Sequence, residues 1–102
     1  MLEKLQRLAS ASIQLLPVSG ITNHFVLERG GYVALVERTT DNNFGRVGDS
    51  GLLTSEGFAA LVWRPEGGFF VNKRCERPAE PAEVEEIRRF SRDLRAALDD
   101  SR

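Results

Sequence analysis

Apolar residues recur every three or four positions over the first sixteen residues, with polar and charged residues between them. This spacing places the apolar side chains on one face of a helix, so the pattern predicts a helix from Met1 to about Leu16. Pro17 ends it, because proline disfavours a helical conformation in the residue before it. Residues 10–14 have only middling helix propensity, and an extended conformation of residues 13–16 is the alternative.

Two runs rich in β-branched and aromatic residues follow, Thr22 to Arg29 and Tyr32 to Arg38. They are joined by Gly30-Gly31, and two glycines adopt the positive φ angles of a type I′ turn without strain, which predicts a hairpin. A two-residue loop fixes the register. The predicted pairs are Arg29 with Tyr32, Glu28 with Val33, Leu27 with Ala34, Val26 with Leu35, Phe25 with Val36, and His24 with Glu37. One face is nearly all apolar and the other is mixed.

A second hairpin is predicted from Gly57 to Arg64 and from Phe69 to about Arg74. Its turn, residues 65–68, consists of residues that favour turns. The simplest register pairs Trp63 with Phe70, Val62 with Val71, Leu61 with Asn72, and Ala60 with Lys73. Trp63 and Phe70 then form a cross-strand aromatic pair, which we assign to the core.

The C-terminal region carries the clearest helical stripe, from Ala82 to about Asp99. The stripe consists of Val84, Ile87, Phe90, Ser91, Leu94, Ala97 and Leu98. Glutamates crowd the first turn, where the helix dipole favours negative charge, and arginines follow on what we interpret as a solvated face. Residues 78–81 hold two prolines and are interpreted as a stiff linker.

The predicted order is helix, four strands, helix (α-β-β-β-β-α), in a single small α+β domain spanning residues 1–102. A four-stranded antiparallel sheet, made of the two hairpins and flanked by the helices in two layers, is the natural arrangement. Both hairpins also carry apolar residues on their second face. Either the helices split, one on each face, or the leftover apolar surface meets another copy of the chain.

The composition and the charge of the chain argue against several classes of function. The net charge is −1 and no region is strongly basic, which argues against nucleic-acid binding. The single cysteine forbids an intramolecular disulfide and fits a reducing cytoplasm. The N-terminus lacks the layout of a secretory signal, and the apolar runs are too short to span a membrane. Most of the 14 basic residues are arginine, a composition typical of a bacterial GC-rich genome.

The segment Asp41 to Gly51 is rich in glycine, asparagine and aspartate, which predicts a connector between the hairpins. The alternative is a cradle for a phosphate or another anion. Its residues would be Gly45, Arg46, Gly48, Ser50 and Gly51. A phosphate-binding P-loop also needs Gly-Lys-Ser/Thr at the start of a helix, which is missing. An EF-hand calcium loop needs glycine at its sixth position and glutamate at its twelfth, where this segment has Arg46 and Leu52.

Catalytic candidates are few. His24 beside Glu37 is a polar pair that could orient an imidazole as a general base, but no nucleophile lies at a recognisable spacing. Cys75 is surrounded by cationic residues, which lower a thiol pKa, although a small residue at a strand end is the simpler interpretation. One histidine and one cysteine do not make a structural zinc site, and no cofactor is expected.

These patterns favour a small non-enzymatic module that acts through protein–protein contact and associates with itself as a homodimer. The alternative is a binder of a small anionic ligand or nucleotide through residues 41–51. A third hypothesis is an enzyme that uses His24 with Glu37, or Cys75.

Overall fold

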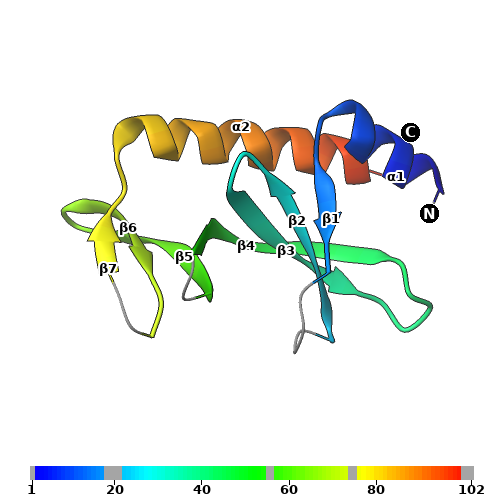
Figure 1. Ribbon diagram of the computed structural model, residues 1–102, viewed down its shortest axis with the longest axis horizontal. Helices are drawn as coiled ribbons and strands as arrows, with labels where there is room; N and C mark the ends of the chain where they lie inside the picture. Colours follow the sequence, from blue (N-terminus) through cyan, green and yellow to red (C-terminus); the bar gives the residue numbers. More distant parts are fainter. Residues whose placement is uncertain (1, 18–21, 55–56, 74–75, 100–102) are drawn as a thin grey trace.

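The computed structural model describes residues 2–17, 22–54, 57–73 and 76–99. They form two helices and a sheet (Figure 1). The helices are α1 (Leu2–Ser10) and α2 (Pro81–Leu98), and the strands are β1 (Gln14–Leu16), β2 (His24–Arg29), β3 (Tyr32–Arg38), β4 (Phe44–Thr54), β5 (Gly57–Arg64), β6 (Gly67–Val71) and β7 (Glu76–Pro78).

The sheet has seven strands in the order β1-β2-β3-β4-β5-β6-β7, and every strand is antiparallel to its neighbours. The fold is therefore α+β, but the predicted four-stranded sheet is wrong. The three additional strands are β1, β4 and β7. Because each strand pairs only with its neighbours in sequence, the sheet is a simple meander.

Strand β4 is the element in which the structure departs most from the sequence-based prediction. The connector predicted for Asp41 to Gly51 is wrong, because Phe44–Thr54 is one strand of 11 residues. It pairs with β3 along most of its length, with register shifts on either side of Val36. Pairing with a neighbouring strand has overridden the low β-propensity of its glycines and polar residues. Only residues 39–43 turn the chain, and there Asn42 has a φ of 60°.

The other two missed strands lie at the sheet edges. The predicted helix from Met1 to Leu16 is wrong in its second half, because α1 ends at Ser10 and Ser12 turns the chain with a φ of 61°. The extended alternative for residues 13–16 is confirmed in β1, which pairs Gln14–Leu16 with β2. Part of the predicted linker, Pro78, instead belongs to β7.

The two predicted hairpins differ in outcome. All six predicted pairs between β2 and β3 are confirmed, because the Gly30-Gly31 loop leaves one register. The register predicted for the second hairpin is wrong by two residues. Arg64 pairs with Gly67, so the loop is Pro65-Glu66 alone, and Leu61 rather than Trp63 faces Phe70. A shift of two keeps every side chain on its predicted face.

Helix α2 covers one face of the sheet, and α1 packs beside its C-terminal half (Figure 1). Leu27, Ala34 and Val36 pack with Phe90 and Leu94 in the main core cluster. A smaller cluster of Ala59, Phe70 and Ile87 lies below the first half of α2. The two helices therefore share one side of the sheet rather than splitting between both. Across the described ranges, neither helix has the length and apolar character needed to cross a bilayer.

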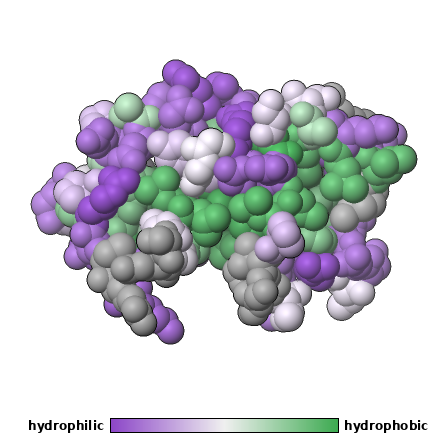
Figure 2. Space-filling view, viewed as in Figure 1, coloured by the Kyte–Doolittle hydropathy of each residue, from purple (hydrophilic) through white to green (hydrophobic). Residues whose placement is uncertain are grey.

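The face turned away from the helices carries an apolar surface on β4, β5 and β6. Directly paired residues share a face, and the face opposite Ala59 and Phe70 presents a set that we call the β5–β6 patch. Its members are Leu53, Phe58, Ala60, Val62, Phe69 and Val71. Leu53 is 44% exposed and Val62 37%, and the other four are half-buried. Elsewhere, a band of apolar surface runs beneath the charged residues of α2 (Figure 2).

Candidate functional site

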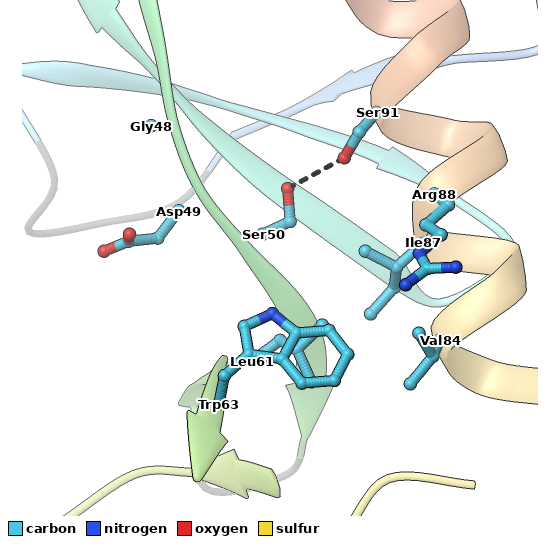
Figure 3. Close-up of a pocket in the computed structure, with 9 residues that line it drawn as sticks. All are labelled: Gly48, Asp49, Ser50, Leu61, Trp63, Val84, Ile87, Arg88 and Ser91. Carbon is cyan, nitrogen blue, oxygen red and sulfur yellow. Dashed lines mark hydrogen bonds between the residues drawn. The ribbon is translucent and has the colours of Figure 1, made fainter. Parts of the chain in front are cut away.

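The residues predicted to form an anion-binding loop lie along β4. Gly48 and Ser50 line a cleft between the sheet and α2 (Figure 3). Gly45 borders a different, open hollow beside the C-terminal end of α2. Gly51 is buried where β4 pairs with β5, and Arg46 is exposed and lines neither. The structure therefore brings two of the five residues into one site and spreads the other three along the strand.

The predicted polar pair is adjacent. His24 and Glu37 lie opposite each other on β2 and β3, where His24 is half-buried and Glu37 is exposed. The Glu37 carboxylate accepts a hydrogen bond from the backbone N–H of Arg46 (3.3 Å), which ties it to β4. Cys75, the other residue considered for catalysis, lies outside the described residues.

The cleft lies where β4 and β5 separate. Their pairing runs from Thr54–Gly57 to Gly51–Ala60, whereas β4 extends back to Phe44 and β5 on to Arg64. Helix α2 forms the other side of the opening (Figure 3). The volume is about 520 Å³, which falls in the range of pockets that hold small ligands.

The cleft combines an apolar floor with a polar end. Leu61 from β5 and Val84 and Ile87 from α2 supply the apolar side chains. The hydroxyls of Ser50 and Ser91 lie 3.4 Å apart and close one end (Figure 3). Two short side chains at this crossing let α2 approach β4 closely, and the helix and β5 diverge beyond it.

Trp63 forms the wall opposite α2. Its side chain lies on the helix side of the sheet, yet it is 59% exposed. The assignment of Trp63 to the core is therefore wrong, while Phe70 is buried as predicted. The indole packs over its cross-strand partner Gly68, where a Cβ atom would lie 3.2 Å from Cζ3 of the ring. Because Gly68 has no side chain, the Trp63 ring can pack directly against its backbone.

Arg88 brings a positive charge to the cleft from α2 (Figure 3). The arginines that follow it are paired, Arg89 with Glu86 at 3.0 Å and Arg92 with Asp93 at 3.5 Å. Arg88 itself has no ion pair or hydrogen bond to any residue within the described ranges. An anion entering the cleft would therefore meet a guanidinium with free donors.

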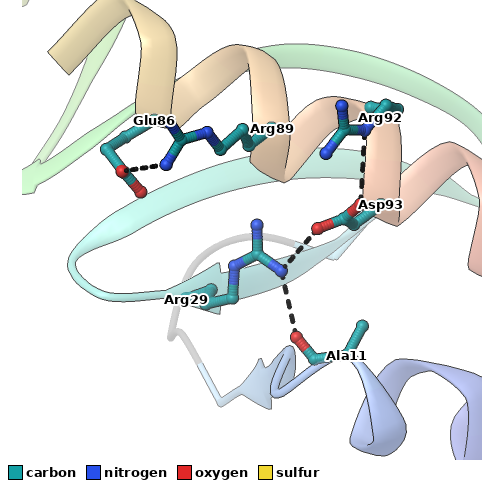
Figure 4. A network of polar contacts seen from close by, with 6 residues as sticks. All are labelled: Ala11, Arg29, Glu86, Arg89, Arg92 and Asp93. Carbon is teal, nitrogen blue, oxygen red and sulfur yellow. Dashed lines mark hydrogen bonds and ion pairs between the residues drawn. The ribbon is translucent and has the colours of Figure 1, made fainter. Parts of the chain in front are cut away.

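Two further ion pairs hold α2 to the sheet. Arg77 on β7 donates two hydrogen bonds to Glu83 (2.9 and 2.7 Å), and this pairing lowers the pKa of the Glu83 carboxyl. Arg29 on β2 donates to Asp93 (2.9 Å) and to the carbonyl oxygen of Ala11 (3.1 Å), as Figure 4 shows. The hydrogen bond from Arg29 lowers the pKa of Asp93. These pairs fix the helix that forms one wall of the cleft.

Sequence reasoning missed Trp63 and Arg88. The periodicity gives Trp63 the correct face, but the separation of β5 from β4 leaves it uncovered. Arg88 resembles the other arginines of a solvated helix face. The one available signal was Gly67-Gly68 across from Trp63, since glycine in a strand often marks a close approach by another group. In the part of the chain that the structure describes, no group of three His, Cys, Asp or Glu side chains could hold a metal ion.

Comparison of the chain with known protein families, with curated proteins and with solved structures gives no match. The surfaces and the cleft are therefore the features of this chain that bear on its function. A fold by itself does not specify a function, whereas the chemistry of a site constrains what it can bind.

Proposed function

We propose that this protein is a small non-enzymatic module that acts through protein–protein contact and pairs with itself through the β5–β6 patch. The observation that supports this function is the apolar face that neither helix covers. Monomeric proteins rarely expose contiguous apolar patches larger than a few hundred Å², and larger patches are typical of interaction sites. Leu53 and Val62, at 44% and 37% exposure, lie on this face.

The charges beside the patch fit a second copy of the chain as the partner. Arg64 and Glu76 form an ion pair on the same face, and the Arg64 guanidinium lies 5.1 Å from the centre of the Phe69 ring. In a two-fold dimer the same patch faces itself, so each side must carry groups that complement its own. One cation and one anion together satisfy that condition. A net charge of −1 adds little repulsion between copies.

Sedimentation equilibrium over a wide concentration range tests the proposal. We expect the wild-type chain to sediment as a dimer and Val62→Glu to sediment as a monomer, because burying an unpaired carboxylate in an apolar interface is costly. Leu5→Glu is the matched control, since Leu5 is also 37% exposed but lies on α1. A wild-type chain that stays monomeric at the highest concentration, or a Leu5→Glu variant that dissociates as fully as Val62→Glu, contradicts the proposal.

We place this module in the bacterial cytoplasm. The single cysteine fits a reducing compartment, and the excess of arginine over lysine fits a GC-rich bacterial genome. An alkaline phosphatase fused to the C-terminus should stay inactive in a bacterial host, because that enzyme needs disulfides that form outside the cytoplasm. An active fusion would contradict the location.

A further inference from the structure

We propose that the cleft between β4, β5 and α2 binds a short extended peptide in which an apolar side chain lies next to a carboxylate. Three features meet there: an exposed indole held in place and, among the residues that the structure describes, a strand edge without a partner strand and a guanidinium without an ion pair. Each matches one part of such a peptide. This site lies on the helix side of the sheet and is separate from the β5–β6 patch.

The backbone of β4 supplies the edge. Residues 44–50 pair with β3 on one side, and β5 pairs with β4 only from Gly51 onward. An unpaired edge presents N–H and C=O groups that an extended peptide can pair with as an added strand. Gly48 and Asp49 are exposed and line the cleft, so this edge is accessible. Gly48 has no side chain to obstruct an approaching backbone.

Trp63 supplies the apolar contact. Its ring packs over Gly68, so its position is fixed before a ligand arrives, and little side-chain freedom is lost on binding. Across from it lie Val84 and Ile87 (Figure 3). An aliphatic side chain placed between them would cover the indole, which is 59% exposed in the free chain. Removing this apolar area from water favours the complex.

Arg88 supplies the charge complement. Hydrogen bonds between a guanidinium and a carboxylate are frequently paired and are stronger than neutral ones. The Asp49 carboxylate points away from Trp63 and Arg88 in Figure 3, so it leaves the guanidinium available. The Ser50 and Ser91 hydroxyls, which close one end of the cleft, add hydrogen-bond donors. A small carboxylate would satisfy Arg88 and Trp63, but only a peptide also uses the strand edge.

A nuclear magnetic resonance titration of the ¹⁵N-labelled full chain tests this site. Trp63 is the only tryptophan, so its indole N–H gives one signal. The probes are the blocked peptide acetyl-Val-Leu-Val-Asp-amide, its counterpart with Asn in place of Asp, and hexanoate. The variants are Arg88→Gln and, as the matched control, Arg92→Gln, which removes a charge one turn further along α2 and outside the cleft.

With the Asp peptide we expect saturable shifts of the Trp63 indole and of the amides of residues 48–50, together with slower hydrogen exchange of those amides. The Asn peptide should bind about fivefold more weakly, and so should the Asp peptide to Arg88→Gln, because the exposed Arg88 loses an ion pair that solvent screens in part. Arg92→Gln should bind like wild type. The proposal is overturned if the Asp peptide gives no saturable shift, or if Arg88→Gln and Arg92→Gln behave alike. It is also overturned if hexanoate reproduces the response in full, which would make the cleft a small-molecule site.

Discussion

Gly51 and Ala59 approach so closely across β4 and β5 that a Cβ atom on Gly51 would overlap the carbonyl oxygen of Ala59. The contact is with the backbone, which cannot rotate away as a side chain can. Gly51 sits at the last pair before the two strands separate, where it faces Ala60. A residue that the sequence offers as an anion contact is therefore needed for strand packing.

Gly51→Ala should destabilise the protein by about 1–3 kcal/mol, because the added methyl group forces the two strands apart. Urea denaturation monitored by Trp63 fluorescence measures the change. Gly48→Ala is the matched control on the same strand, since its Cβ would lie 3.2 Å from the Leu35 carbonyl oxygen, a tight contact but no overlap. Equal stability of Gly51→Ala and wild type would contradict the close approach of β4 and β5 at this position.

The pair of Arg77 and Glu83 predicts a loss of stability in acid. The folded-state pKa of Glu83 is lowered, first by its hydrogen bonds from Arg77. A lowered carboxyl pKa stabilises the folded state above the unfolded value, here 4.5, and the contribution is lost as the pH falls through the folded pKa. Glu83→Gln should therefore cost about 1 kcal/mol at pH 7, since Arg77 is half exposed and solvent screens the pair.

At a pH below both values, the wild type and Glu83→Gln should be equally stable. Chemical denaturation at a series of pH values gives the comparison. Glu85→Gln is the control, because Glu85 lies 4.0 Å from Arg89 on the exposed side of the same helix. A difference between wild type and Glu83→Gln that does not shrink in acid would assign the effect to packing rather than to charge.

Arg29 should be more sensitive to substitution than an arginine on the exposed surface of α2. It contacts Asp93, the Ala11 carbonyl and, at 5.7 Å, the ring of Phe90, so it joins β2, the end of α1 and α2 (Figure 4). Arg29→Met keeps the length of the side chain but removes these donors, and should lower the melting temperature. Arg92→Met, on the exposed surface of α2, should change it little. Thermal unfolding followed by circular dichroism ranks the two variants, and equal melting temperatures would contradict the role given to Arg29.

The elements that the sequence predicted correctly have strong local signals. The Gly30-Gly31 loop leaves β2 and β3 one register, and the apolar stripe of α2 runs over 18 residues. Strands β1 and β7 have three residues each, too few for a period to emerge. Strand β4 has glycines at positions 45, 48 and 51, which give it a low strand propensity, and its conformation depends on its pairing with β3 and β5.

The cleft was only partly predictable from the sequence, because its shape also depends on how the strands pair. Ser50 and Gly48 were selected by composition, but their use depends on where β4 and β5 part. Arg88 carries no sequence signal that separates it from a solvated arginine, and the signal for Trp63 is limited to the glycines across from it, Gly67 and Gly68. Their roles follow from one tertiary fact, which is that α2 passes over a gap in the sheet.

The meander order has a consequence for how the chain acquires its structure during synthesis. Each strand pairs with the one made just before it, so the sheet can grow in step with translation and needs no distant partner. The main cluster, however, takes Phe90 and Leu94 from α2, the last element. A nascent chain that has emerged only as far as β7 therefore exposes both faces of its sheet, and the ribosome must release about twenty more residues before one face is sealed.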